Sequence, residues 1–398
     1  MNRGRVGALL LPVVLACSAC APEAVVAVAP SAAAIASSTP TATPDPTPEA
    51  TPTPTPCSNL VQLANWDDSR LAMLTIAVPV SEVAPGAALE EVSAGAGGVL
   101  LFGSAAPSNL GSQLASLESH VPGQVGLLVM TDEEGGGIQR MANLVGSLPW
   151  PSWMGWNWSA AQIQAAVNRV GRNMYADGVN MDLAPVVDVD GSNVAPGATN
   201  PDGWRSFSGN TNVVTRDGLA FMNGLKSANV IPVLKHFPGL GGSTGNTDNG
   251  SASTLPWSTL QSVAIPPFAA AINAGASAIM VSNAKVPGLT TMPASLSPAV
   301  MAELETLQFH GLVMTDSLSA RAIAAAGYTI PAAAVQAMRA GADMVMFGLP
   351  ATTADTVAQT FAIRSAIVAA VANGTLSRSR LIAAAGAVFA SRQVDLCS

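Results

Sequence analysis

Residues 230–250, VIPVLKHFPGLGGSTGNTDNG, decide the fold of this chain. They begin as an apolar, β-branched run, which changes abruptly at Lys235 and His236. Pro238 follows, with a segment of Gly, Ser, Thr, Asn and Asp that suits neither a helix nor a strand. Parallel β/α barrels present their functional groups in this way, where a buried strand runs into a polar loop. The pattern predicts a strand at 230–235 with a functional loop after it.

The same kind of apolar, β-branched run recurs along the chain and alternates with Ala- and Leu-rich stretches. Eight strands are predicted, at 74–80, 98–102, 125–131, 179–184, 230–235, 277–282, 311–315 and 342–347. Each is almost continuously apolar, as expected of strands buried on both faces. Helices are predicted between them, including 159–177, 215–227, 260–274 and 298–307. The alternation predicts a closed (β/α)₈ TIM-type barrel as a single catalytic domain.

An open, doubly wound sheet is the alternative to a barrel. Such a sheet would carry Gly-x-Gly-x-x-Gly after its first strand, and no such motif is found there. Residues 135–137 are three successive glycines, but they follow a pair of acids and have the wrong spacing for a phosphate cradle. We therefore favour the barrel.

Composition limits the class of protein. The chain has 398 residues, is 49% hydrophobic and 11% charged, and has a formal net charge of -8. This is enough apolar sequence for one large domain. The acidic balance and the lack of any Lys/Arg cluster argue against a nucleic-acid partner.

Residues 1–20 have the composition of a targeting segment. Arg3 and Arg5 precede an apolar run, 6–16, that is too short to span a bilayer. The run ends in Val-Leu-Ala-Cys at Cys17, which resembles a bacterial lipoprotein signal, and Cys20 is the alternative lipidated residue. An ordinary secretory signal is the other interpretation. Either way we expect an exported protein, lipid-anchored on the extracytoplasmic face of the cell membrane or secreted.

Two further features frame the predicted domain at 57–398. Residues 21–56 consist mainly of Ala, Pro, Thr and Ser, which predicts a disordered, extended tether. Cys57 and Cys397 stand at the two ends of the domain. In an oxidising compartment we expect them to form a disulfide, and two free thiols are the alternative.

Polar residues follow the predicted strands at their C-terminal ends, although the chain has few charges. In a barrel these positions converge on one mouth. A single such residue is more often a hydrogen-bonded strand end than a catalytic group, but several together predict a site. They are Asp132 to Glu134 with Arg140, Asp182 and Asp188, Lys235 and His236, Asn283 and Lys285, and Asp316.

Asp316 is the clearest single candidate for chemistry. It follows the strand 311–315, so we expect it at the barrel rim, partly desolvated. It would lie near Lys235 and His236, which when cationic would hold it ionised, as a carboxylate nucleophile requires. The alternative is a helix N-cap for the residues after it.

Several stretches, in one order, resemble glycoside hydrolase family 3 in its single-domain β-N-acetylhexosaminidase branch. The resemblance covers about 67–390. Lys-His-Phe-Pro-Gly at 235–239 is the most specific of its motifs. The matching stretches are LLVMTDEEGGGIQRM, GVNMDLAPVVDVD, WRSFSGN, VLKHFPGLG, SAIMVSNAKVP with PASLS, GLVMTDSLSARAI and AVQAMRAGADMVMF.

The resemblance implies roles for particular residues. Asp316 would be the nucleophile that forms a covalent glycosyl-enzyme. The terminal sugar would be bound by Asp132, Arg140, Arg205, Lys235 and His236. An Asp with Arg and Lys suits hydrogen bonds to sugar hydroxyls and an acetamido oxygen. His236 as a structural histidine is the alternative. His120 and His310 match no site motif. No cofactor is implied.

The loop after residue 239 departs from the family pattern. Related hexosaminidases carry there the His that acts as acid/base, with a supporting Asp. This chain has Asn246 in place of the supporting Asp and Asp248 in place of the catalytic His, and Leu240 stands in place of an earlier His of the same motif. In one interpretation Asp248 is the acid/base, with its pKa raised as the loop closes. In the other, the site turns over poorly or has become a cell-wall sugar-binding module.

Taken together, the sequence predicts an exported retaining glycosidase. We expect it to remove terminal β-linked N-acetylhexosamine from glycans such as peptidoglycan fragments, and to be a monomer. A β-glucosidase-like hydrolase is a further alternative, because Asn283 stands where the family often has a His. No metal site is predicted, because the cysteines are terminal and no His/carboxylate cluster has ligand spacing.

Overall fold

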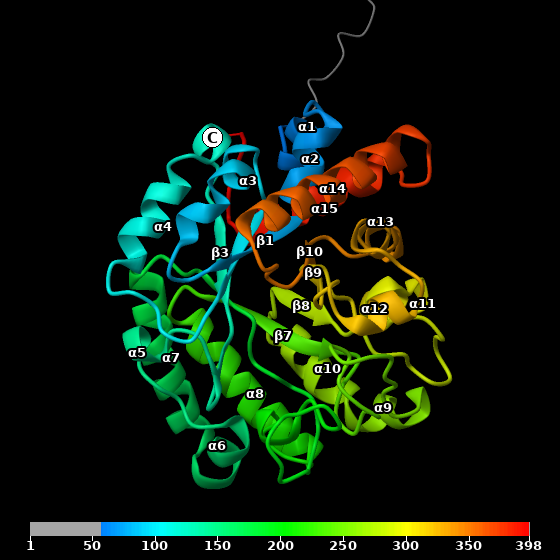
Figure 1. Ribbon diagram of the computed structural model, residues 1–398. Helices are drawn as coiled ribbons and strands as arrows, with labels where there is room; N and C mark the ends of the chain where they lie inside the picture. The colour runs from blue at the N-terminus through cyan, green and yellow to red at the C-terminus, as the bar shows by residue number, and fades with distance from the viewer. Residues whose placement is uncertain (1–56, 398) are drawn as a thin grey trace, which may run out of the picture. The chain divides into compact units, whose positions relative to one another are not determined.

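Eight parallel strands form one sheet whose two ends meet, as the sequence predicts. A computed structural model describes residues 57–397 (Figure 1). The order in the sheet is β10-β1-β2-β3-β6-β7-β8-β9. At the seam, Thr315 N donates to Met344 O at 3.0 Å, and Met314 bridges Met344. The strands are β1 (Ile76–Ser81), β2 (Gly98–Phe102), β3 (Leu128–Thr131), β6 (Met181–Asp182), β7 (Ile231–Phe237), β8 (Ala278–Val281), β9 (Leu312–Thr315) and β10 (Val345–Met346).

Helices surround this sheet and cover its outer face (Figure 1). Those before residue 200 are α1 (Asn59–Leu63), α2 (Asp68–Leu74), α3 (Leu89–Ser93), α4 (Leu110–Glu118), α5 (Ala142–Val145), α6 (Pro151–Asn157) and α7 (Ala160–Ala176). Those after it are α8 (Thr211–Lys226), α9 (Trp257–Val263), α10 (Ile265–Asn273), α11 (Pro298–Thr306), α12 (Arg321–Ala325), α13 (Ile330–Ala340), α14 (Thr353–Ala372) and α15 (Arg378–Ser391). None of these helices is long and apolar enough to cross a membrane.

The predicted helix at 260–274 is two helices, because proline interrupts its hydrogen bonding. α9 ends at Val263, and α10 begins at Ile265 with Pro266 and Pro267 in its first turn. Proline has no backbone N–H and is tolerated only at the start of a helix. The remaining predicted helices appear with small shifts at their ends.

Apolar side chains fill both sides of the strands. The larger cluster lies between the strands and the helices. A second cluster is rich in methionine and includes Met130, Met181, Met280, Met314, Met344 and Met346. Methionine is unbranched and adapts to the irregular space inside a barrel. Burial on both faces explains why the strands are almost continuous apolar runs in the sequence.

The first and last elements of the domain lie side by side, with α1 and α2 next to α14 and α15 (Figure 1). Cys57 and Cys397 form the expected disulfide there. The predicted signal at 1–20, with its candidate lipidation sites Cys17 and Cys20, and the predicted tether at 21–56 lie outside the described residues.

Candidate active site

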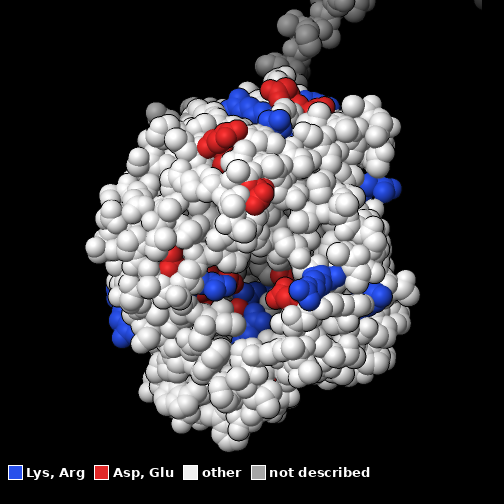
Figure 2. All heavy atoms as spheres, in the orientation of Figure 1, with Lys and Arg blue, Asp and Glu red and all other residues white. Residues whose placement is uncertain are grey.

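A cavity of about 540 Å³ opens at the C-terminal ends of the strands. Figure 2 shows a hollow on this face in which acidic and basic side chains gather. Every candidate sugar-binding and catalytic residue that the sequence predicts lines this cavity: Asp132, Arg140, Arg205, Lys235, His236, Asp248 and Asp316. They come from separate stretches of the chain, and the barrel brings them together.

Strand ends and the connections after them place these side chains. Asp132 directly follows β3. Lys235 and His236 belong to β7, whose pairing with β8 is irregular between Leu234 and Phe237 and whose Lys235–His236 peptide is cis. Both of these neighbouring side chains line the cavity.

A network of alternating charges forms the floor of the cavity. The Lys235 ammonium lies 2.8 Å from Asp132 Oδ1 and 2.6 Å from Glu134 Oε1. Arg205 binds Glu134 in a bidentate manner, with Nε–Oε2 and Nη2–Oε1 distances of 2.8 Å. Arg140 Nη2 lies 3.2 Å from Asp132 Oδ2. Bidentate pairing of this kind fixes the guanidinium plane as well as its charge.

The network fixes the charge of its members at neutral pH. Burial raises the pKa of Asp132, but Lys235 and Arg140 outweigh it, so the pKa lies below its ordinary value. Burial likewise raises the pKa of Glu134, and Arg205 and Lys235 hold it well below the ordinary range. The pKa of Lys235 is lowered by burial but raised overall by Asp132 and Glu134. The acids are therefore ionised and the lysine is protonated.

Glu134 is a site residue to which the sequence analysis gives no role. A two-stranded antiparallel hairpin, β4 (Glu133–Gly135) with β5 (Ile138–Gln139), carries it, and the sequence analysis predicts no strands there. The side chain of its neighbour Glu133 does not line the cavity. It accepts from Met141 N and Gln139 Nε2, and burial raises its pKa to about 7. Glu134 is among the polar residues that the sequence predicts at the barrel mouth, but its pairing with Arg205 and Lys235 is seen only in the structure.

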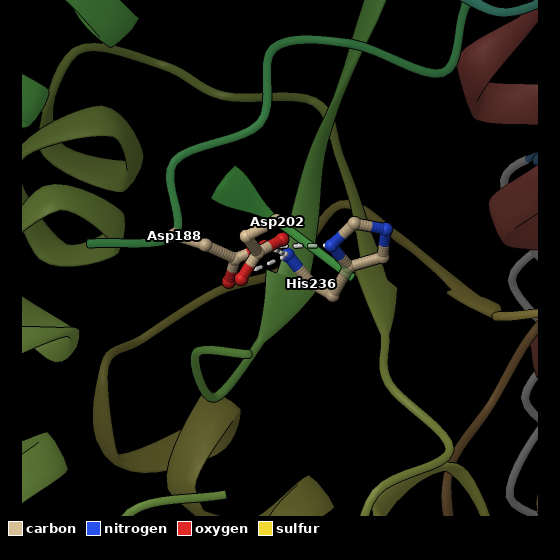
Figure 3. A group of neighbouring side chains, drawn as sticks. All are labelled: Asp188, Asp202 and His236. Carbon is tan, nitrogen blue, oxygen red and sulfur yellow. Dashed lines mark hydrogen bonds and ion pairs between the residues drawn. The ribbon is translucent and has the colours of Figure 1, made fainter. Parts of the chain in front are cut away.

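His236 is held by Asp188 in a fixed orientation (Figure 3). The distance from His236 Nδ1 to Asp188 Oδ2 is 2.6 Å, and Asp188 also accepts from the backbone N–H groups of His236 and Leu240. The Nδ1–H group of His236 donates to Asp188, which leaves Nε2 as an acceptor for Arg205 Nη2, 3.3 Å away. Burial, and then the charge of Arg205, lower the pKa of His236 to about 4. His236 is therefore neutral at pH 7.

Asp202 completes a buried group of possible metal ligands with Asp188 and His236 (Figure 3). Their ligand atoms lie within 4.8 Å of one another, and neither carboxylate oxygen of Asp202 has a partner in the structure. Burial, and then the field of Asp188, raise the pKa of Asp202 well above its ordinary value. The Nδ1–H of His236 already occupies Asp188, and the nearby Arg205 supplies positive charge to these carboxyl groups, so we assign no metal. The sequence alone does not reveal this cluster, because its members come from separate segments.

Asp316 lies directly after β9, at the rim of the cavity. Its backbone N–H donates to Val281 O at 2.9 Å, and its Oδ1 accepts from Ser317 N at 2.6 Å. It is not a helix N-cap, because the next helix, α12, begins at Arg321 with Ala320 as its N-cap. The N-cap alternative is therefore wrong.

The electrostatic environment of Asp316 also differs from expectation. Burial raises its pKa above the ordinary value, and the neighbouring Asp248 adds to this, against the opposing effects of His236 and Lys235. From the sequence, cationic His236 and Lys235 are expected to hold Asp316 ionised. The charge of Lys235 is shared by Asp132 and Glu134, and the opposing effects of His236 and Lys235 are smaller than the desolvation of Asp316.

The loop that departs from the family pattern reaches the same cavity. Leu240 is buried and lines it, as do Asn246 and the exposed Asp248. Asp248 N donates to Asn246 Oδ1 at 2.9 Å, and Ala322 N donates to Thr247 O at 3.0 Å, which attaches the loop to α12. Asp248 is thus the titratable side chain that this loop brings to Asp316.

The two remaining histidines lie outside the site, and Asn283 has a structural role. His120 and His310 are exposed and do not line the cavity. Asn283 is buried, donates to Ser317 O at 2.7 Å and accepts from Ser295 Oγ at 2.6 Å. Asn283 therefore supports the segment that follows Asp316.

Fold and site together define a class of protein. It is a (β/α)₈ barrel with carboxylates, cations and hydrogen-bonding groups in a cavity at its C-terminal mouth, which is where barrel enzymes carry their active sites. The chain belongs to glycosyl hydrolase family 3, because the N-terminal domain of that family matches residues 87–390. The resemblance noted in the sequence is confirmed.

Individual relatives agree with this family. Beta-hexosaminidase LpqI of Mycobacterium tuberculosis is 35% identical over 233 residues, which cover 56% of this chain and 59% of that protein. The chain thus spans about three fifths of this curated relative. The solved structure of M. tuberculosis LpqI is 29% identical with a TM-score of 0.75, over 84% of this chain and 96% of that one. A beta-N-acetylhexosaminidase from Beutenbergia cavernae is 29% identical with a TM-score of 0.73, over 83% and 100%.

Proposed function

We propose that this protein is a retaining glycoside hydrolase that removes terminal β-linked N-acetylhexosamine residues from glycans. The observation that carries the proposal is the position of Asp316. It shares one cavity with Asp132, Arg140, Arg205, Lys235 and His236. Relatives named for β-hexosaminidase and β-N-acetylhexosaminidase activity support the choice of substrate.

In this proposal the charge network binds the terminal sugar. The ionised Asp132 accepts from sugar hydroxyls, and Arg140, Arg205 and Lys235 donate to hydroxyl and acetamido oxygens. Because these groups already hold one another in place, little side-chain freedom is lost when the sugar binds. The neutral His236 presents a ring nitrogen to the same cavity.

Asp316 then acts as the nucleophile. Its carboxylate oxygen forms a bond to the anomeric carbon while the bond from that carbon to the leaving oxygen breaks, and an acid protonates the leaving oxygen. Water afterwards attacks the glycosyl-enzyme and restores the carboxylate, with retention of configuration.

Asp248 serves in this proposal as the acid that protonates the leaving oxygen and later as the base that activates water. Its loop reaches the cavity of Asp316, and its charge is close enough to raise the pKa of Asp316. A pair of carboxyl groups on one cavity is what retaining glycosidases use.

We also propose that the protein acts outside the cytoplasm on cell-wall glycans such as peptidoglycan fragments, as a monomer. The Cys57–Cys397 disulfide supports export, because disulfides persist in oxidising compartments. Cys17 is the proposed lipidated residue and Cys20 its alternative. We expect Cys17→Ala to move the protein from the membrane fraction to the soluble exported fraction. Retention of this variant in the membrane fraction would place the anchor at Cys20. A wild type that is already in the soluble fraction would have no anchor.

Hydrolysis of 4-nitrophenyl N-acetyl-β-D-glucosaminide tests the proposed activity. We expect Asp316→Ala to lower kcat by at least about 10⁴-fold, as removal of a nucleophile does. Equal rates for this variant and the wild type would overturn the assignment. A panel of 4-nitrophenyl sugars separates this activity from that of a β-glucosidase-like hydrolase. A sugar-binding protein without turnover would show only a ligand-dependent rise in melting temperature.

The role of Asp248 has its own test. We expect Asp248→Ala to lose about 10²–10⁴-fold in kcat, as loss of general acid–base catalysis does. Azide restores part of the rate and forms the glycosyl azide, because it replaces the water that Asp248 activates. The Asn246→Ala variant, altered in the same loop, is the control and shows no azide effect. Absence of azide rescue in Asp248→Ala would move the acid/base role to another residue.

A further inference from the structure

A second cavity, of about 620 Å³, lies beside the candidate active site. Four of the seven tryptophans of the protein line it: Trp150, Trp153, Trp156 and Trp204. We call this cavity the tryptophan groove. Its volume is within the range of ligand-binding sites in proteins.

The helix α6 presents two of these indoles to solvent. Trp153 and Trp156 are three residues apart, so they project from neighbouring positions of the helix, with 48% and 85% of their surface exposed. Pro151 and Met154 are buried and attach α6 to the rest of the domain. Water-exposed indoles are costly in hydrophobic free energy, and exposed apolar groups gathered in one place mark binding surfaces.

The other two indoles are held in fixed positions. Trp204 Nε1 donates to Asn193 Oδ1 at 2.8 Å. The ring centroids of Trp150 and Trp204 are 5.9 Å apart, with a tilt of 57°. A Cβ atom at Gly136 would lie 2.0 Å from the Trp150 ring, so the ring packs directly on the glycine backbone of the β4–β5 turn. These rings form a preorganised surface rather than a loose one.

The tryptophan groove adjoins the candidate active site. Trp150 lines both cavities. Trp204 and Arg205 are adjacent in the short 3-10 helix Gly203–Arg205, and Trp204 lines the groove while Arg205 lines the active-site cavity. A ligand held in the active-site cavity therefore has this groove as its immediate neighbour.

The chemistry of the groove suits neutral sugars. No Lys or Arg is among the described residues that line it, and the surface around α6 shows no charged residue in Figure 2. Its one acid, Asp190, is occupied by Ser192 N at 2.7 Å and Gly203 N at 3.3 Å. Ser152, Asn157 and Ser208 supply hydroxyl and amide groups. These groups offer hydrogen bonds without selecting for charge.

Indole faces bind sugars whose hydroxyls are all equatorial. Such a ring presents C–H groups on both faces, and their positive hydrogens meet the negative face of the indole. β-linked N-acetylglucosamine units have this geometry. We propose that the tryptophan groove binds further N-acetylhexosamine units of the glycan whose terminal unit lies in the active-site cavity. The inference rests on the proposed function and extends it from single sugars to oligosaccharides.

A Trp153→Ala/Trp156→Ala double variant tests the groove. The probes are β-1,4-linked N-acetylglucosamine hexamer and 4-nitrophenyl N-acetyl-β-D-glucosaminide. We expect the ratio of kcat/KM for the hexamer to kcat/KM for the monosaccharide to fall at least about tenfold, through KM, since the loss of two stacking indoles weakens binding. The control is Tyr175→Ala, which removes an aromatic side chain that is 52% exposed and lines neither cavity. In the control the ratio stays the same. An unchanged ratio in the double variant would overturn the proposal.

Titration calorimetry separates failure of this inference from failure of the proposed function. If the wild type does not hydrolyse the monosaccharide, the proposed function fails, and hexamer binding still tests the groove. Tighter binding of the hexamer than of N-acetylglucosamine, lost in the double variant and kept in Tyr175→Ala, supports the groove. Equal affinities for hexamer and monosaccharide refute it.

Discussion

Replacement of Glu134 by Gln removes one charge from the buried network with almost no change in shape. The Glu134 side chain is 1% exposed and accepts from both Arg205 and Lys235. After the substitution Lys235 keeps Asp132 at 2.8 Å, whereas Arg205 has lost the carboxylate that it bound in a bidentate manner. The variant thus tests whether a buried cation without its partner destabilises this barrel.

The burial of the pair sets the size of the expected effect. Removing one partner of a buried ion pair costs about 3–5 kcal/mol, whereas an exposed pair contributes about 0–1 kcal/mol. The pair Arg378–Asp68 has the same 2.8 Å separation, but its side chains are 40% and 27% exposed. We therefore expect Glu134→Gln to lower the free energy of unfolding by about 3–5 kcal/mol and Asp68→Asn to lower it by less than about 1 kcal/mol.

The contribution of Glu134 to the free energy of unfolding depends on pH with a definite sign. Burial raises the pKa of Glu134, but Arg205 and Lys235 outweigh it and hold the pKa of the folded state below the ordinary value of 4.5. A depressed carboxyl pKa adds stability that is fully present above the unfolded-state pKa and declines as the pH falls below it. The difference between wild type and Glu134→Gln is therefore constant near neutral pH and becomes smaller below pH 4.5.

Urea unfolding of both variants, with the disulfide intact, measures these differences at pH 7 and again below pH 4.5. The double variant Glu134→Gln/Arg205→Met removes the unpaired cation as well. Its loss of unfolding free energy is therefore smaller than the sum of the losses in Glu134→Gln and Arg205→Met alone. Equal losses in Glu134→Gln and Asp68→Asn would refute the reasoning, as would a difference that does not shrink in acid.

Two further predictions concern other parts of the molecule. Gly136→Ala displaces the Trp150 ring, so we expect it to cost about 1–3 kcal/mol more than Gly374→Ala, whose φ of 76° is also positive but whose Cβ would meet no atom within 4 Å. Thermal unfolding and tryptophan fluorescence measure the difference, and equal costs would contradict the prediction. Cys57 and Cys397 are separated by 340 residues, so reduction of their disulfide lowers the free energy of unfolding by on the order of 5 kcal/mol in the chain-entropy model. A Cys57→Ser variant with unchanged stability in urea would rule this out.

The fold follows from local sequence patterns to a large extent. Strands buried on both faces are continuous apolar runs, and the strand predicted at 98–102 is observed with the same ends. Placement of the site at the mouth also follows, because polar residues after parallel strands meet at one end of a barrel. The β4–β5 hairpin could not be predicted, since its sequence, EEGGGIQ, has neither a strand period nor a familiar turn spacing.

Pairings between distant segments were decided only by the tertiary structure. Arg205 and Glu134 are 71 residues apart, and His236 and Asp188 are 48 apart, so no local spacing reveals either contact. Tertiary contacts also set the charges of the site, because Asp132 and Glu134 keep Lys235 protonated, and burial with the nearby Arg205 keeps His236 neutral. The barrel and the residues at its mouth can be predicted from local sequence patterns. The protonation state of those residues depends on burial and on neighbouring charges, and both exist only in the folded chain.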